Sequence, residues 1–251
     1  FNNKYILKLV DKITKYIYKK SDVILVQSEA FKNYIVNQDV PLTKIKYFPN
    51  PTESFYNIAN INEEYINLLP KGFNLIFAGN IGEAQSFDTL IDAAFKLKQL
   101  NYPIFWNILG DGRAKNQYEK KVLQLNLTEN FIFKGSFKSE EMPLFFACGN
   151  ALIVSLKKSK IFSLTIPAKV QSYLASGKPI LGSIDGEGAK IIIESGAGFV
   201  SPLGHQQRRS SQAGIGLRRS CLENQSPNYQ QRRCRRLGPA KSFFQCAHPW
   251  F

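Results

Sequence analysis

The stretch Phe73-Asn-Leu-Ile-Phe-Ala-Gly79-Asn-Ile-Gly82 joins a largely apolar run to a glycine-containing turn. The apolar run has the length of a strand that is covered on both faces, because a strand with one wet face alternates apolar and polar residues. Residues 87–100 follow with apolar side chains at helical spacing. A strand, a glycine turn and a helix in this order are typical of a parallel α/β sheet.

The same unit recurs along the chain. Further strands are predicted at residues 103–109, 131–134, 151–156 and 179–184, with a last one near 199; further helices are predicted at 114–126, after Ser139, after Pro167 and at 187–194. Strand and helix thus alternate about five times between residues 73 and 200. The fold class we expect is α/β: a Rossmann-like parallel sheet with helices on both faces.

The residues before this series predict a smaller unit. Residues 4–20 have the spacing of an amphipathic helix with lysines outside its apolar face. Short strands are predicted at 22–28 and 45–48, with a helix at 29–37 between them, and Pro49-Asn-Pro51 ends regular structure. We expect a connector over 52–70.

Composition excludes several classes of protein. With 44% hydrophobic and 21% charged residues, the 251-residue chain is not mainly disordered, collagen-like or a disulfide miniprotein. It has no run of 18 uncharged apolar residues, so a membrane-spanning helix is not expected. The net charge of +14 suggests an anionic partner. The chain starts at Phe1 and its only methionine is Met142, which suggests a fragment.

The charge is distributed unevenly, with a break near residue 201. Residues 1–201 hold 23 Lys and one Arg, and their net charge is +6, whereas residues 202–251 hold eight Arg and one Lys, with a net charge of +8. This tail has three interpretations: a sequence translated out of frame, a disordered tail, or a basic arm for nucleic acid or anionic lipid. We predict that residues 202–251 are disordered or out of frame.

Three loops at predicted strand ends are candidate sites, because ligands of open parallel sheets bind at the carboxyl ends of the strands. The first loop holds Gly79, Asn80 and Gly82, and glycines let a backbone approach a ligand closely. A plain tight turn is the alternative for this loop. This loop does not match the GxGxxG dinucleotide pattern, and the chain contains no GxxxxGK[ST] phosphate loop.

The other two loops add cations at predicted helix starts. Gly110-Asp-Gly112 precedes Arg113 and Lys115, and Pro167 precedes Lys169 and Ser172. Helix starts prefer acidic side chains, so cations there suggest a bound anion, and arginine can hold a phosphate with two hydrogen bonds. Solvated side chains are the alternative. Together the three loops predict a pocket for a diphosphate. The acids Asp185 and Glu187 could contact sugar hydroxyls, or could simply be solvated.

Four stretches of the chain resemble a known family. They are DVILVQS at 22–28 with FPNP at 48–51, FAGNIGEAQSFDTLI at 77–91, ILGDGR at 108–113 with FKG at 133–135, and PAKVQSYLASGKPI at 167–180 with GEG at 186–188. Residues 5–201 resemble the later part of a GT-B retaining glycosyltransferase of the group-1 (GT4-type) family. The nearest members are bacterial enzymes that build surface polysaccharides.

The resemblance implies a division of the chain and a function. Residues 1–52 would end the N-terminal acceptor domain and form the hinge, and residues 53–201 would bind a nucleoside-diphosphate sugar. The donor would contact Gly79, Asn80, Gly82, Arg113, Lys115, Lys169, Ser172 and Glu187, and the base would contact Phe133 and Lys134. Cations would neutralise the leaving diphosphate. Such enzymes usually need no metal, and we predict no metal and no cofactor.

The chain departs from the family pattern at several positions. Asn80 and Gln85 stand where many relatives carry Arg and Lys, and the family's paired glutamates would fall at Leu164 and Ser172. We therefore assign no catalytic residue, and an inactive fragment is the alternative within the family. Outside it, the alternatives are a basic nucleic-acid-binding protein and a Rossmann-type epimerase or dehydrogenase. The absence of a nucleic-acid motif, of GxGxxG and of Tyr-x-x-x-Lys argues against them.

The expected partners follow from the resemblance. They are a nucleotide-sugar donor and a glycan or lipid-linked acceptor, and nucleic acid is not expected. We expect a cytoplasmic protein, with the lysines of helix 4–20 touching the inner membrane as one hypothesis and a packed helix with a solvated face as the other.

Overall fold

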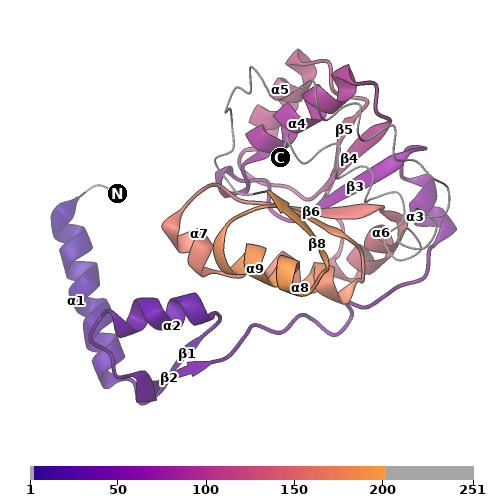
Figure 1. Cartoon of the computed structure of the whole chain (residues 1–251). Helices are drawn as coiled ribbons and strands as arrows, with labels where there is room; N and C mark the ends of the chain where they lie inside the picture. Colours follow the sequence, from indigo (N-terminus) through magenta and orange to yellow (C-terminus); the bar gives the residue numbers. More distant parts are fainter. Residues whose placement is uncertain (1–2, 202–251) are drawn as a thin grey trace, which may run out of the picture.

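A computed structural model describes residues 3–201 (Figure 1). Its main feature is a six-stranded sheet in the order β5-β4-β3-β6-β7-β8, in which every neighbouring pair is parallel. The strands are β3 (Phe73–Ala78), β4 (Ile104–Leu109), β5 (Phe131–Gly135), β6 (Ala151–Ser155), β7 (Ile180–Ser183) and β8 (Gly198–Ser201). The expected parallel sheet is confirmed. The interpretations of residues 202–251 concern a part of the chain outside the described residues.

The strand order determines where a ligand can bind. The chain proceeds from β3 outward to β4 and β5, then returns to pair β6 with the other edge of β3 and continues to β7 and β8. The register pairs Leu75 with Trp106 on one side and with Ala151 on the other. The direction of winding therefore reverses between β3 and β6. Crevices at the carboxyl ends of the strands beside such a reversal are the usual ligand sites of open α/β sheets.

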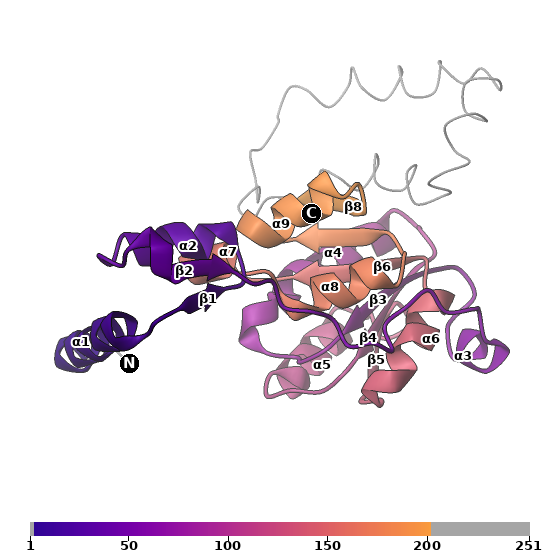
Figure 2. The ribbon, with the colours of Figure 1, turned by 90° about the horizontal axis from the view of Figure 1, so that it is seen from below.

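Helices cover both faces of this sheet (Figures 1 and 2). One face carries α4 (Phe87–Gln99) and α5 (Lys115–Gln124), and the other carries α6 (Met142–Cys148), α8 (Ala168–Ala175) and α9 (Gly186–Glu194). Each strand sends alternate side chains to the two faces, so Phe77 belongs to the first core and Ala78 to the second. Because both faces are covered, the four inner strands β4, β3, β6 and β7 contain almost only buried residues.

The N-terminal residues form a smaller unit. Helix α1 (Lys4–Lys20) precedes β1 (Ile24–Val26), α2 (Glu29–Val36) and β2 (Ile45–Tyr47), and the two strands pair in parallel. Both views place α1 at the end of the molecule farthest from the larger sheet (Figures 1 and 2). None of its residues is buried. Its apolar stripe is therefore uncovered in this structure.

Polar contacts join the two units. The Ser28 hydroxyl accepts from the Phe31 amide, which caps α2, and donates to the carbonyl of Leu164 at the end of α7 (Lys160–Leu164). The Gln171 side-chain amide donates to the Asn50 carbonyl over 2.7 Å. The connector between the units thus lies against α8, which places its residues beside the candidate site.

Short elements differ from our expectations. Helices α3 (Glu63–Asn67) and α7 were not predicted, because five residues are too few to show a helical period. We expected Ser139 to cap a helix. Instead Ser139–Glu141 is a 3-10 turn that leads into α6, and Glu141 accepts a hydrogen bond from the Lys138 amide over 2.9 Å.

Candidate functional site

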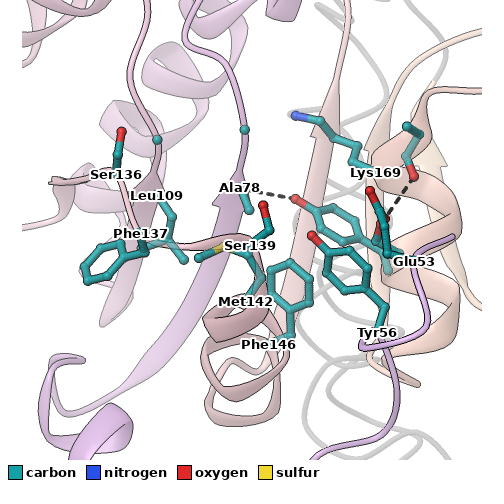
Figure 3. Close-up of a pocket in the computed structure, with 15 residues that line it drawn as sticks. Glu53, Tyr56, Ala78, Leu109, Ser136, Phe137, Ser139, Met142, Phe146 and Lys169 are labelled. Atoms are coloured by element: carbon teal, nitrogen blue, oxygen red, sulfur yellow. Dashed lines mark hydrogen bonds between the residues drawn. The ribbon is translucent and has the colours of Figure 1, made fainter.

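A cavity of about 360 Å³ opens at the carboxyl ends of β3 and β4 (Figure 3). Its size lies within the range of small-molecule sites, about 300–1,000 Å³. The wall draws on the connector, two strand ends, the segment between β5 and α6, and helices α6 and α8. The lining residues are Glu53, Tyr56, Ala78, Gly79, Leu109, Gly110, Ser136, Phe137, Ser139, Met142, Phe146, Ala168, Lys169, Ser172 and Tyr173.

The floor of the cavity is made by two strand ends that touch backbone to backbone. Gly79 donates its amide to the Leu109 carbonyl over 2.9 Å. Gly110 has a φ of +138°, and a Cβ at that position would lie 2.0 Å from the Gly79 carbonyl oxygen. Only glycine fits here, because both the backbone angle and the space exclude a side chain. A ligand can therefore approach the sheet edge closely.

Lys169 is the one lysine among the residues that line the cavity. Its side chain extends from α8 toward the strand that ends at Ala78 (Figure 3). The Lys169 Nζ lies 3.6 Å from the centroid of the Phe77 ring. It is buried and has no hydrogen-bond partner among residues 3–201. Burial lowers the pKa of Lys169 to about 7, because a low-dielectric site disfavours the charged form.

The first turn of α8 adds backbone donors beside Lys169. The helix starts after Pro167, which makes no side-chain cap, and Ala168 and Lys169 both line the cavity. Uncapped amides and the positive end of the helix dipole attract anions. The Lys169 amine without a hydrogen-bond partner and this helix end thus point to the same ligand chemistry, an anion.

Hydroxyl groups from α8 and from the connector also line the cavity. The Ser172 hydroxyl is buried, 3.2 Å from that of Thr52 and 3.5 Å from the Ala168 carbonyl. Tyr56 stacks on Phe146 with ring centroids 6.0 Å apart. Burial raises the pKa of Tyr56 and the Glu53 carboxylate raises it further, so the phenol stays protonated near neutrality. These groups offer the cavity hydrogen bonds without charge.

Tyr173 holds the end of β3 in place. The Ala78 amide donates to its phenol oxygen over 2.9 Å, and this bond is drawn in Figure 3. We expect Tyr173→Phe to lower the free energy of unfolding by about 1–3 kcal/mol, because the buried amide loses its acceptor. Urea unfolding tests this. Tyr65→Phe, which removes a part-buried bond to the Glu141 side chain and leaves no buried backbone amide without an acceptor, is the control and should cost less. Equal losses would contradict the role given to Tyr173.

Several predicted donor contacts lie beside the cavity and do not line it. The Asn80 side chain packs over the backbone of Gly82 and Gly112, where a Cβ would lie 2.8 Å and 2.6 Å from it. Arg113 is exposed on the same turn. Lys115 is shared between two carboxylates, Asp111 at 4.0 Å and Glu119 at 3.9 Å. The structure therefore brings Gly79, Lys169 and Ser172 together and leaves the other loop residues at the margin.

The remaining predicted residues lie farther from the lining. Phe133 packs against the core on the α4 and α5 face. The Lys134 ammonium donates to the Leu68 carbonyl over 2.6 Å, and burial lowers the pKa of Lys134. Glu187 lies in the first turn of α9. Their contacts to a base or a sugar stay predictions.

The sequence did not point to the connector residues of this site. Glu53 and Tyr56 lie in a stretch without periodicity, and Phe77 and Tyr173 read simply as core residues. The aromatic pair at residues 55–56, which begins four residues after Pro51, is the one local signal that could have marked this wall.

No group of three or more His, Cys, Asp or Glu side chains among residues 3–201 could hold a metal ion. Among the helices described, none combines the length and apolar character needed to cross a membrane.

Comparisons of sequence assign the chain to a family. The family model described as "Glycosyl transferases group 1" matches residues 62–212. The putative colanic acid biosynthesis glycosyl transferase WcaI of Escherichia coli K12 is 27% identical over 156 residues, which cover 60% of this chain and 37% of that protein. The uncharacterized glycosyltransferase MJ1059 of Methanocaldococcus jannaschii is 31% identical over 138 residues, covering 53% and 34%. The chain thus spans about a third of the length of these relatives.

Solved structures share the fold. Anabaena Alr3699/HepE, crystallised with UDP-glucose, superposes with a TM-score of 0.63 at 16% identity, over 94% of this chain and 65% of that one. The sucrose-phosphate synthase of Thermosynechococcus elongatus also gives 0.63 at 16% identity, over 80% and 51%. These likenesses establish the GT-B type of α/β architecture. Since the family model covers more than half of the 251 residues, the chain belongs to the group 1 glycosyltransferases.

Proposed function

We propose that this chain binds the donor of a retaining glycosyltransferase that uses a nucleoside-diphosphate sugar, and that the donor's diphosphate enters the cavity at Lys169. The observation that carries the proposal is the buried amine of Lys169, which has no hydrogen-bond partner among residues 3–201 and lies next to the uncapped start of α8. Similar proteins support the donor class, because the HepE structure contains UDP-glucose and the pneumococcal transferase GtfA was crystallised with UDP and GlcNAc. The name of WcaI supports a role in polysaccharide synthesis.

Charge placement indicates what the site would do. In glycosyl transfer from such a donor, negative charge accumulates on the diphosphate as the bond to the sugar breaks. Fixed donors aimed at that charge stabilise the transition state, and the Lys169 ammonium and the α8 amides are such donors. Glu53 is the only carboxylate among the lining residues, which makes it the candidate contact for sugar hydroxyls. The positions of the family's paired glutamates hold Leu164 and Ser172.

The residues proposed to hold the donor include those outside the lining. Gly79, Lys169 and Ser172 form the cavity, while Asn80, Gly82, Arg113 and Lys115 could contact the part of the donor that extends beyond it. Phe133, Lys134 and Glu187 remain proposed contacts to the base and the sugar. We keep the proposed division into 1–52 and 53–201, since β1 and β2 form a sheet separate from β3–β8.

Calorimetry tests the donor class. We titrate UDP-, GDP- and ADP-glucose into the full chain at two salt concentrations. We expect saturable binding of one nucleotide class with a modest salt dependence, because the contact is a few short hydrogen bonds and one cation. A folded chain that binds none of the three would overturn the proposal. Tight binding of nucleic acid with a steep salt dependence would support the nucleic-acid alternative instead.

Helix α1 supports a membrane-associated acceptor. Its apolar residues are exposed, with 58% of Leu9, 50% of Ile13 and 54% of Ile17 accessible, and six lysines accompany one acid, Asp11. A basic amphipathic helix of this kind suits the anionic inner surface of a membrane. We propose that this face contacts lipid, which would bring the site near a lipid-linked acceptor.

Vesicles containing phosphatidylglycerol test the contact. The double variant Leu9→Glu with Ile13→Glu should bind at least tenfold more weakly than the unchanged chain, because each apolar side chain contributes about 1.5 kcal/mol or more on burial. Neither change affects a buried residue, so the fold should persist. Equal binding by both chains would reject the lipid contact and leave the face to a protein partner.

A further inference from the structure

Lys169 differs in kind from the other buried polar groups. Five buried side-chain atoms lack a hydrogen-bond partner among the described residues: Asn107 Oδ1, Ser155 Oγ, Lys169 Nζ, Gln171 Oε1 and Ser183 Oγ. Four belong to groups that stay neutral. Lys169 alone can gain a charge, so its state depends on what enters the cavity.

Geometry disfavours the charged form while the cavity is empty of anions. The Nζ lies over the Phe77 ring at 3.6 Å, and a Cβ on Gly79 would approach it to 3.3 Å. An ammonium buried without a counter-ion is strongly disfavoured, and a cation–π contact offsets only about 2 kcal/mol of that cost. A neutral amine suits this place better.

The other titratable groups on the cavity wall do not compensate the charge. The connector contributes Glu53 and Tyr56, and α8 contributes Tyr173. The ends of β3 and β4, the segment between β5 and α6, and α6 itself contribute to the lining only uncharged residues. Burial is the single cause of the lowered pKa of Lys169, and no carboxylate raises it. Burial raises the pKa of Tyr56 and of Tyr173, so both phenols keep their protons.

We propose that donor binding is coupled to the uptake of one proton by Lys169, so that the neutral amine of the free chain becomes the ammonium that pairs with the diphosphate. The inference rests on the proposed function. The proton comes from solvent, and no covalent bond changes in this step. When the nucleoside diphosphate leaves after transfer, the proton leaves with it or returns to solvent, so binding and release both depend on pH.

The coupling predicts the shape of the pH dependence. With a folded pKa of about 7, Lys169 is mostly neutral at pH 8 and mostly protonated at pH 6. Proton uptake on binding should therefore be near one at about pH 8 and should fall toward zero at about pH 6. Above pH 8 the affinity should fall by up to about tenfold per pH unit.

Calorimetry in two buffers measures the proton directly. UDP-, GDP- and ADP-glucose are titrated into the full chain at pH 8 in HEPES and in Tris, whose ionisation enthalpies differ, and the difference in heat gives the protons taken up. Sugar nucleotides are the right probes, because their diphosphate is a diester, whereas a free nucleoside diphosphate has a terminal phosphate with a second pKa of about 6.

Two variants and a control assign the proton. Lys169→Met should bind more weakly with no uptake, and Lys169→Arg, whose charge is permanent, should bind with no uptake and a flat pH profile. Lys178→Met is the matched control. Burial lowers the pKa of Lys178 as well, but Lys178 is only partly buried, donates to the Ala147 carbonyl over 2.6 Å and does not line the cavity. Lys178→Met should therefore leave the proton uptake on binding unchanged.

Each outcome decides between the two proposals. Binding by the unchanged chain without uptake at pH 8 overturns the coupling and leaves the proposed function standing. Uptake that persists in Lys169→Met or Lys169→Arg overturns the assignment to Lys169. If no sugar nucleotide binds at pH 6 or at pH 8, both the coupling and the proposed function are overturned. If Lys169→Met does not fold, the pH profile of the unchanged chain still decides.

Discussion

Replacing Lys169 with methionine is expected to weaken nucleotide-sugar binding at neutral pH about ten- to a hundredfold while leaving the free chain more stable. A hydrogen bond to a charged group contributes about 1.5–3 kcal/mol, which corresponds to that loss of affinity. The variant is more stable without ligand because it no longer buries an amine that lacks a hydrogen-bond partner. Calorimetry on both chains measures the affinity, with Lys178→Met as the control.

The gain in stability should depend on pH with a definite sign. The pKa of Lys169 is about 7 in the folded chain and 10.5 when exposed, so between these values the unfolded chain binds a proton that the folded chain does not. The folded chain is therefore penalised most at pH 7 and below, and its stability rises with pH in this window by up to about 1.4 kcal/mol per unit. Lys169→Met lacks this dependence.

Urea unfolding at pH 7 and pH 9 tests this sign. The advantage of Lys169→Met over the unchanged chain should shrink by about 2 kcal/mol between the two pH values. A variant that is less stable than the unchanged chain at pH 7, or a difference that is the same at both pH values, would show that Lys169 does not lie buried and unpaired.

Gly110→Ala is expected to cost about 2–5 kcal/mol of folding free energy. The new Cβ would meet the Gly79 carbonyl oxygen at 2.0 Å, and the backbone would be held at a φ of +138°. Backbone strain contributes about 1–2 kcal/mol, and overpacking adds about 1–3 kcal/mol. The two strand ends would separate, so donor binding should be lost even where the chain still folds.

Gly196→Ala is the matched control for this prediction. Gly196 also has a positive φ, +65°, but no atom lies within 4 Å of the position of its Cβ. It should therefore cost only the backbone strain, about 1–2 kcal/mol. Urea midpoints of the two variants compare them directly, and equal losses would mean that the contact between Gly79 and Gly110 does not hold the cavity floor.

Much of the fold was predictable from local pattern. Helix α1 has the predicted bounds 4–20, and the apolar run 73–78 is strand β3. Long amphipathic helices and doubly buried strands carry this information in their own residues, because periodicity reflects which faces are covered. Helix α7 could not be predicted from the sequence. Its five residues are held by contacts with α9 and with Ser28, and they show no helical periodicity of their own.

The site was predictable in its location but not in its lining. Strand ends followed by glycines pointed to Gly79 and Gly110, and both residues line the cavity that we propose as the site. The pattern could not show how far a long side chain reaches, so it treated Lys115 and Lys169 alike. The first lies between Asp111 and Glu119, and the second crosses to the Phe77 ring. Glu53 and Tyr56 join the wall only because the connector lies against α8, which is a tertiary contact that no local pattern records.

A crystal structure of the chain with the sugar nucleotide that binds it tests the central claim most directly. That claim is that the cavity at Lys169 receives the donor's diphosphate. We predict diphosphate oxygens within hydrogen-bond distance of Lys169 Nζ and of the first amides of α8. A diphosphate held at Arg113 and Lys115, with Lys169 still lying unpaired over the Phe77 ring, would contradict the account.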